Sequence, residues 1–533
     1  MHDYTSKEWY LPRGSDVWYT QQLSSYFRWN KIDSMCGLMQ KKSYTAFIIL
    51  AGLCAAHVIA VLQILQSNAR LHRTITAVKD AGYLAVPNDL VAPSLKTIHT
   101  ALMGGIFFTL SIGAGVTLLA LWSTWVWKYA CSRKPYLAIL FVLPWIAFLV
   151  GVNLKGLSIL PSLYFTIVPA LVVVLALKFT PDHLARAGWA RGCFHAVVIL
   201  LLAILWITQI NGNMFINIRD RLLLTNSLGV GINDFYYRYT LYPAEVFKSL
   251  HQKMIKTCRA DISSDRSLQK QLLVILADRN YLAVKKTESV DLAMVANNGK
   301  LLLLNRGHTM IETSLPKFMD TPGPLLKSFS RQCDRHVFFR QFTFLSLLVA
   351  FPVVLYIFVH AFLCRLATFF IKPGAAVVLA GLLCLVIGAL LILPVKAGMQ
   401  KEITPDQISD LLQSVKWQDN VDALKTIAGQ KRTWKFDIGT PELVSNAHIP
   451  VRYWLARGLA RSTGPEAHAN LLKLMDDPQP IVACQALYSL GQRGGKKTIK
   501  IILDKIRRSD HWYVQWYAYN ALRALGWRQK ISI

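Results

Sequence analysis

The residues best suited to chemistry lie in a tyrosine-rich stretch, residues 231–245, which reads GINDFYYRYTLYPAE. Four tyrosines and a phenylalanine fall between Phe235 and Tyr242. Tyrosine combines an apolar ring with a hydroxyl group that needs a partner, so it suits the edge of a core, a membrane interface or a binding surface. The candidate binding residues of this region are Arg219, Asp220, Asn233, Asp234, Tyr236, Tyr237, Arg238 and Tyr242.

Three interpretations of this stretch remain open: the core of a small domain, a segment docked onto a membrane bundle, and a ligand site. The third corresponds to a membrane-embedded enzyme that acts on a lipid-linked substrate near residues 219–245, and it requires the polar side chains to converge. No nucleophile–base pair stands at a suitable spacing, and the chain contains no GxxxxGK[ST], HExxH, GxSxG or GxGxxG motif. We therefore expect no catalytic residue, and no motif or ligand set indicates a cofactor or a metal.

The tyrosine-rich stretch is flanked by long apolar runs, and the helices that these runs form must position its residues. The chain has 533 residues, of which 53% are hydrophobic, and several windows exceed the roughly 18 apolar residues of a transmembrane helix. None of these windows contains Asp or Glu, which counts against an ion-coupled transporter. The seven expected spans are residues 43–66, 99–127, 135–153, 161–179, 193–210, 341–363 and 373–395.

The orientation of the chain is set by the charges near these spans. Lys and Arg are denser in the loops that follow the second, fourth and sixth spans, which favours a cytoplasmic N-terminus and an extracytoplasmic C-terminal domain. Residues 1–42 show no cleavable signal peptide. The compact loops suggest a bacterial inner membrane.

The sequence divides into five modules. The segment 211–340 reads as a small α+β domain: a helix with Pro243 in its first turn and an apolar face reaching Cys258, a second helix near 267–279, and two strands joined by a turn at Asn298-Gly299. Cys258 and Cys333 in this domain form either a disulfide or two free thiols. The modules are a polar tail (1–42), a five-helix membrane bundle (43–210), the α+β domain (211–340), two further spans (341–397) and a C-terminal repeat domain (398–533).

Two features of the spans have a functional and a simpler interpretation. His195 and His360 fall near the same membrane face, which permits a bis-histidine haem site, although interfacial histidines explain each of them more simply. Gly374, Gly381 and Gly388 recur every seven residues, so a neighbouring helix can approach closely; static packing is favoured over a moving interface.

The C-terminal domain is repetitive. VRYWLARGLA (451–460), VACQALYSLG (482–491) and VQWYAYNALR (514–523) superpose at offsets of 31 and 32 residues, with apolar positions four residues apart as on one helical face. Asp477 and Asp510 precede the second and third copies, where a helix cap is expected. The segments PEAHANLLKLM and KKTIKIILDKI between the copies read as partner helices, and NVDALKTIAGQKR (420–432) as a degenerate earlier copy.

This pattern resembles HEAT-like repeats, in particular the short variety of phycobilisome-lyase-type proteins, over roughly 100 residues. The resemblance implies an α-solenoid that binds a protein. It does not carry over the lyase activity of some relatives, because no residue here is identifiable as catalytic. The candidate partner-binding residues are Trp454, Lys496, Lys497, Lys500, Arg507, Arg508 and Trp516.

The expected fold class is therefore a mainly α, polytopic membrane protein with a small α+β domain and an α-solenoid of HEAT-like repeats. We expect an integral membrane scaffold, assembly factor or accessory subunit; a channel or transporter and the membrane enzyme are the alternatives. Lys and Arg are spread along the chain, so nucleic acid is not an expected partner, whereas membrane lipids and a protein are. The oligomeric state stays open, and the basic residues 496–508 suit a solvated helix face, an acidic protein or anionic lipid.

Overall fold

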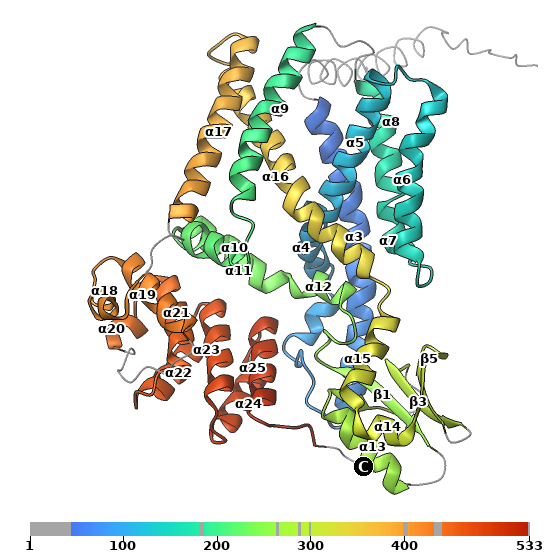
Figure 1. Ribbon diagram of the computed structural model, residues 1–533, viewed down its shortest axis with the longest axis vertical. Coiled ribbons are helices and arrows are strands. Elements are labelled where there is room, and N and C mark those ends of the chain that lie inside the picture. The colour runs from blue at the N-terminus through green and yellow to red at the C-terminus, as the bar shows by residue number, and fades with distance from the viewer. Residues whose placement is uncertain are drawn as a thin grey trace, which may run out of the picture.

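The computed structural model describes residues 44–180, 186–262, 266–285, 289–297, 300–397, 403–430 and 440–530. The expected polar tail and the Asn298-Gly299 turn lie outside these ranges. Helices dominate the fold, and Figure 1 shows long helices at one end of the molecule and two smaller folded parts at the other.

Seven helical stretches are long and apolar enough to cross a membrane, and each corresponds to one of the expected windows. The prediction of seven long apolar helices is confirmed, and the helices are compatible with a membrane protein. The stretches are α3 (Tyr44–Asp80), α4 to α5 (Ile98–Tyr129), α6 (Pro135–Asn153), α7 to α8 (Ile159–Phe179), residues 190–207 of α9 (Arg186–Ile207), α16 (Val337–Ala367) and residues 373–392 of α17 (Pro373–Ala397).

Glycines allow these helices to approach closely. A side chain at Gly381 would meet the Phe194 ring of α9 at 2.4 Å, and one at Gly388 would meet Leu202 of α9 at 2.5 Å, whereas Gly374 faces open space. Two of the three glycines of the expected stripe therefore serve packing between α9 and α17. His195 and His360 lie in this part of the bundle with ring centroids 4.5 Å apart, so the rings touch and leave no space for a haem between them.

A chain segment runs across the ends of the apolar helices, between them and the repeat domain (Figure 1). We call residues 214–247 the lateral segment. Asn226 accepts a hydrogen bond from the Gly229 amide and so caps its longest helix. Gly229 is required there because a side chain would lie 2.1 Å from the Leu223 carbonyl oxygen. The lateral segment comprises α10 (Met214–Ile218), the π-helical turn η3 (Arg219–Leu223), α11 (Ser227–Tyr239) and α12 (Leu241–Phe247).

The small domain that follows contains one mixed sheet in the order β2-β1-β3-β4-β5. Strand β1 pairs in parallel with β2 and β3, while β3, β4 and β5 form antiparallel pairs. Cys258, Met294 and Leu303 are buried in its core. The elements are β1 (Lys256–Asp261), α13 (Arg266–Ala277), β2 (Tyr281–Ala283), β3 (Leu292–Asn297), β4 (Lys300–Asn305), β5 (His308–Ser314), α14 (Leu315–Asp320) and α15 (Pro322–Cys333).

The expected helix from Pro243 to Cys258 is wrong. Its first part is α12, which ends at Phe247, and Cys258 lies on β1. Residues 256–261 form a strand because they pair with a strand on each side. This tertiary pairing overrides the helix-like spacing of their apolar residues. The expected helix near 267–279 and the paired strands around residues 298–299 are present. Cys258 and Cys333 are free thiols.

The C-terminal domain is a stack of helix pairs. Helices α19, α21, α23 and α25 pack on one another in succession as an inner row, and α22 and α24 pack against this row. The cap residue of α23 is Gln479, not Asp477; the Asp477 carboxylate accepts the Gln479 N–H at 2.8 Å and also binds Arg452 of the preceding unit, 2.6 Å from Nε. His511, not Asp510, occupies the cap position of α25. The elements are η4 (Pro405–Gln407), α18 (Ile408–Leu412), α19 (Trp417–Gly429), α20 (Pro441–Val444), α21 (Ile449–Leu459), α22 (Ala467–Met475), α23 (Pro480–Arg493), α24 (Thr498–Arg508) and α25 (Trp512–Ala524).

The loop between the first two apolar helices is hydrogen-bonded to the last repeat. The Gln529 side chain exchanges two hydrogen bonds with the Leu84 backbone, at 3.0 and 2.9 Å. The Asn88 amide group donates to the Ile506 and Ser509 carbonyl oxygens, at 2.7 and 3.2 Å, where α24 ends. This loop, which includes η1 (Ala92–Lys96), therefore ties the array to the apolar helices.

Candidate functional site

The centre of the candidate site is the Asp220 carboxylate, which is fully buried. One of its oxygens accepts hydrogen bonds from Arg219 Nε and Nη2 at 2.8 and 2.6 Å. The other accepts one from the Trp454 indole N–H at 2.7 Å and lies 3.3 Å from Lys425 Nζ. The Arg219 guanidinium in turn covers the Tyr453 ring, 3.9 Å from its centroid. We call these five residues the Asp220 cluster; they join η3 of the lateral segment to α19 and α21 of the repeat domain.

The charges of the cluster form a network around one buried carboxylate, which is paired with Arg219 and Lys425. Burial lowers the pKa of Lys425, against the opposing attraction of Asp220. Burial would also lower the pKa of the Arg219 guanidinium, but Asp220 and Tyr453 outweigh it and raise that pKa above its ordinary value. A buried charge is tolerated only when it is paired and hydrogen-bonded, and both Asp220 oxygens meet that condition. The cluster therefore docks one part of the chain onto another.

The tyrosines of the opening stretch continue the same interface. Tyr237 packs against Tyr513 of α25, with ring centroids 5.0 Å apart. Tyr242 contacts the Trp512 ring at 5.1 Å, and its hydroxyl lies 2.7 Å from the Ser94 hydroxyl. Tyr236 contacts both sides: its hydroxyl lies beside that of Tyr513, and its ring contacts Phe107 of α4 at 6.0 Å.

The remaining polar residues of the stretch are not gathered with Asp220. Asn233 is buried, and its amide nitrogen has no hydrogen-bond partner. Burial raises the pKa of the neighbouring Asp234, while Asn233 and Arg238 act in the opposite direction. Arg238 itself is exposed. Among the described residues, no hydrogen bond or ion pair links these three to Arg219 or Asp220, so the convergence that an active site needs is not formed.

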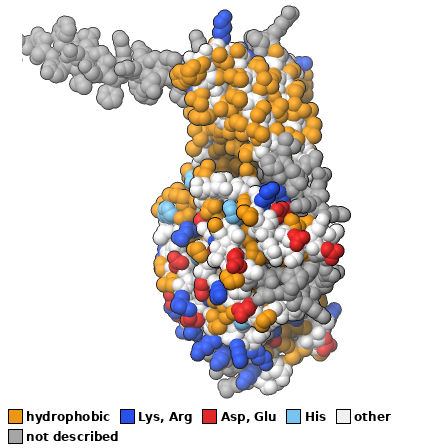
Figure 2. Space-filling view, turned by 90° about the vertical axis from the view of Figure 1, so that its left-hand side faces the viewer, with side chains coloured by type: hydrophobic (Ala, Val, Ile, Leu, Met, Phe, Trp, Pro, Cys, Tyr) orange, Lys and Arg blue, Asp and Glu red, His pale blue; other side chains and the backbone are white. Residues whose placement is uncertain are grey.

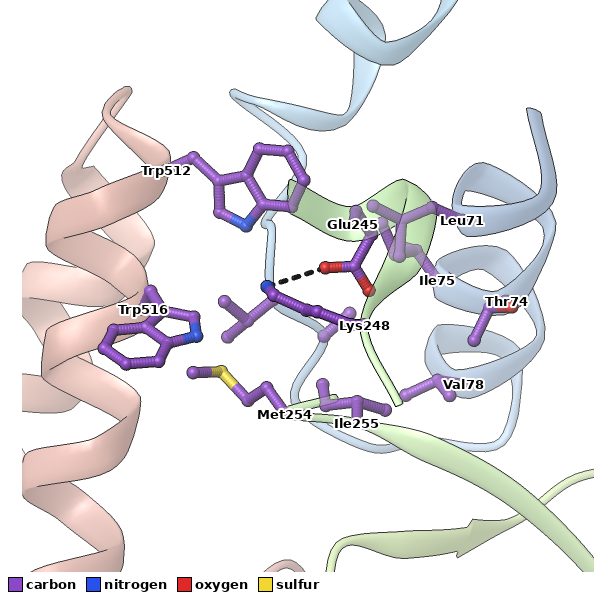
Figure 3. A pocket seen from close by; sticks show the side chains of 12 residues that line it. Leu71, Thr74, Ile75, Val78, Glu245, Lys248, Met254, Ile255, Trp512 and Trp516 are labelled. Atoms are coloured by element: carbon purple, nitrogen blue, oxygen red, sulfur yellow. Dashed lines mark hydrogen bonds and ion pairs between the residues drawn. The ribbon is translucent and has the colours of Figure 1, made fainter. Parts of the chain in front are cut away.

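Trp512 and Trp516 border a small internal gap where α3, α12, α25 and the chain before β1 meet (Figure 3). The gap measures about 20 Å³, room for about one water molecule. Figure 3 shows the ion pair between Lys248 and Glu245, 2.8 Å long, pointing into it. Trp516, one of the expected partner-binding residues, thus faces the inside of the protein, as does Trp454.

The other expected partner-binding residues form an exposed basic face on the outer side of the last repeat. Lys496 and Lys497 directly precede α24, whose buried side faces the array through Ile502 and Ile506. Arg508 pairs with Asp504, while Lys496, Lys497, Lys500 and Arg507 form no ion pair with described residues. We call this set the basic face: Lys496, Lys497, Lys500, Arg507 and Arg508.

Sequence reasoning missed the residues that complete the Asp220 cluster and its surroundings. Lys425 and Tyr453 come from different repeat units, and Asp422 binds Arg221 at 3.2 Å beside them. The one available signal was the presence of bulky aromatic residues such as Trp454 where repeat helices usually carry smaller ones. That signal indicates an unusual contact but does not identify its other side.

Comparison with known proteins gives a family match for part of the chain. A family model described as HEAT repeats matches residues 440–523, which confirms a HEAT-like region at the C-terminus. No curated protein and no solved structure matches this chain. HEAT repeats generally mediate protein–protein interaction, so the match is compatible with a protein partner.

Proposed function

We propose that this protein is an integral membrane scaffold that holds an acidic partner protein on the outer side of its HEAT-like domain. The observation that carries the proposal is the contrast between the two sides of the repeat stack. The inner row is covered by the chain's own lateral segment through the Asp220 cluster, while the basic face on α24 is exposed and largely unpaired. The side left open to a partner is therefore the outer one.

The charge of this side selects the partner's chemistry. Residues 494–511 contain six Lys or Arg and two Asp. Exposed unpaired charges steer an oppositely charged protein toward a surface. Figure 2 shows Lys and Arg gathered at the end of the molecule remote from the apolar band, the end where Figure 1 places α24. Because electrostatic attraction in physiological salt fades over a Debye length of about 8 Å, this position favours an acidic protein over the lipid beside the apolar helices.

The fixed docking of the array supports the scaffold role. The Asp220 cluster and the Tyr237–Tyr513 contact hold the repeats against the lateral segment, and the Gln529–Leu84 hydrogen bonds hold them against the loop that follows α3. A partner bound to such an array stays at the membrane surface, which raises its effective concentration for others located there.

The enzyme and transport alternatives receive less support. Both oxygens of Asp220 are engaged and the residue has no exposed surface, so it is not positioned to transfer a proton to a substrate. The gap lined by Glu245, Trp512 and Trp516 is too small for a lipid-linked substrate.

The proposal is tested with a photo-crosslinking amino acid placed at Lys500 of the full chain in cells. We expect a protein adduct whose contact surface is acidic, and we expect it to disappear in K496Q/K497Q/R507Q. The matched control is K270Q/K317Q/K327Q, which removes three exposed charges from the small domain and should leave the adduct intact. An adduct with lipid only, or one that the basic-face variant does not change, would refute the proposal.

The side of the membrane is tested separately with topology reporters inserted at residues 286–288 and after Ile533. Two apolar helices separate these positions, so seven crossings predict that both reporters give the same result, opposite to a reporter at the N-terminus. Reporters that disagree with each other would show that α16 or α17 does not cross. Agreement on the extracytoplasmic side would support the orientation expected from the loop charges.

A further inference from the structure

A second group of cations lies away from the basic face, around the turn between α6 and α7. Lys155 belongs to the turn between α6 and α7, and its amino group donates to the Arg331 carbonyl oxygen at 2.7 Å. The Arg335 guanidinium lies against Gly156 of the same turn, since a side chain at Gly156 would stand 3.2 Å from Arg335 Nη1. We call Arg70, Lys155, Arg306 and Arg335 the cationic cluster.

The other two members reach the cluster from further elements. Arg306 occupies the β4–β5 turn with a φ of +53°, and Arg70 lies on α3. Arg306 and Arg70 are exposed; partial desolvation and the charges of Arg335 and Arg70 lower the pKa of Arg306, while Asp291 acts in the opposite direction. The four cations therefore converge from α3, the α6–α7 turn, the β4–β5 turn and the link between α15 and α16.

The carboxylates closest to this cluster are already engaged. Asp334 is bound by both terminal nitrogens of Arg340, at 3.0 and 2.6 Å. Asp291 accepts from Lys253 at 3.3 Å and from the Thr257 amide at 3.1 Å. Within the described residues, no member of the cationic cluster forms an ion pair. Asp291 attracts Arg306 without forming an ion pair with it, so the cations of the cluster repel one another with little compensation, and a bound anion would relieve that repulsion.

The surroundings of the cluster indicate which anion. The α6–α7 turn exposes Leu154 and Leu157, which are 74% and 76% accessible on either side of Lys155 and Gly156. The apolar helix α6 that leads into the turn is itself almost entirely uncovered. Figure 1 places this turn above the sheet, at the level where α6 ends and α16 begins. An anion here is adjacent to a continuous apolar surface, which is the combination that a phospholipid presents.

We propose that the cationic cluster binds the phosphate group of an anionic phospholipid whose acyl chains lie along α6 and the leucines of the turn. Arginine suits this task because its planar guanidinium group can offer two parallel N–H donors to phosphate oxygens. The bound lipid bridges the α6–α7 turn and the small domain, two parts of the chain that otherwise touch here through Lys155 and Arg335.

The test is a lipid titration of the full-length protein in detergent, followed by native mass spectrometry. We expect phosphatidylglycerol to bind at least tenfold more tightly than phosphatidylcholine. The variant R70Q/R306Q/R335Q should lose that preference, whereas the charge-matched control K270Q/K317Q/K327Q should retain it. Equal affinity for the two lipids, or an unchanged preference in R70Q/R306Q/R335Q, would overturn the proposal.

Two further arms separate the sources of the phosphate and guard against misfolding. Inorganic phosphate at millimolar concentration should fail to displace phosphatidylglycerol; complete displacement would make this a site for a soluble anion and overturn the lipid assignment. L154S/L157S keeps every charge and should weaken phosphatidylglycerol and phosphatidylcholine alike. If the triple variant does not fold, R306Q, at an exposed turn, replaces it and should reduce the preference severalfold.

Discussion

The Asp220 cluster and the basic face contain the same kinds of side chain and have opposite consequences. In the cluster, one carboxylate meets an arginine, a lysine and an indole N–H, and the carboxylate itself is fully buried. On α24, cations outnumber anions and stay in water. Buried charges with matched partners fix the chain's own geometry, while exposed charges without partners cost the fold little and remain available to another molecule.

The largest effect on stability is expected for Asp220→Ala, which tests whether the buried cluster is structural. It leaves the largely buried Arg219 without its counter-charge and takes one of two nearby carboxylates from the partly exposed Lys425, so we expect the docked array to lose about 3–5 kcal/mol of stability. Hydrogen exchange of the α11 and α21 amides in the detergent-solubilised protein measures the loss. Asp504→Ala, which removes the exposed partner of Arg508, is the control and should cost less than about 1 kcal/mol. Equal effects of the two substitutions would show that the cluster is not structural.

Trp454→Phe isolates one bond of the cluster. A smaller aromatic ring replaces the indole, so Lys425 and Arg457, at 5.3 and 5.0 Å from the Trp454 ring in the wild type, still have an aromatic face beside them. The hydrogen bond from the indole N–H to Asp220 is lost, and we expect a cost of about 2 kcal/mol because the acceptor is charged. The same exchange measurement reports it. In the double variant with Asp220→Ala, the further cost of Trp454→Phe should nearly vanish.

Acidification should loosen the interface at its other end. Burial lowers the pKa of His511 to about 4, and the charge of Arg238 adds to this, while Asp510 acts in the opposite direction. The folded state thus favours neutral His511; its stabilising effect is complete above the unfolded pKa of about 6.5 and is lost as the pH falls from there toward 4.

Between pH 7 and 5 the docking of α25 should weaken by about 1–2 kcal/mol through this residue. Hydrogen exchange of α25 at both pH values gives the size of the effect. His511→Gln should flatten the pH dependence; a variant as acid-sensitive as the wild type would assign the effect to other groups.

The smallest effect on stability is expected for K496Q/K497Q/R507Q. These side chains are exposed and form no ion pair with described residues, so the unfolding free energy of the array should change by less than about 0.5 kcal/mol. Partner retention should fall instead, and in the wild type it should weaken as salt is raised from 50 to 500 mM. A large loss of stability would place the basic face among the structural contacts.

The apolar runs and the repeat spacing in the sequence predicted the long helices and the repeat helices correctly. The apolar runs identified seven helices because a long stretch without charge has few other stable solutions. The offsets of 31 and 32 residues placed α21, α23 and α25 in register. The run around Cys258 was misread because its apolar spacing fits a helix, and only pairing with β2 and β3 makes it a strand.

The candidate site was predicted as two unrelated lists, and the structure brings members of both into one interface. Asp220 and Trp454 are separated by 234 residues, and no periodicity relates them. A buried carboxylate has to find its counter-charges through the tertiary fold, so Lys425 could not be chosen from among the many lysines of the chain. Exposed positions such as Lys500 were easier, since an amphipathic helix indicates its outward side directly.

The hydrogen bonds between Gln529 and Leu84 also have a consequence for the order of synthesis. The two residues are 445 positions apart, so the loop leaves the ribosome long before the residue that completes it. Until then, the Leu84 backbone groups lack this protein partner. Truncation before Gln529 should therefore free the loop at Leu84 while Asn88 still binds the end of α24, so limited proteolysis should show increased cleavage near Leu84.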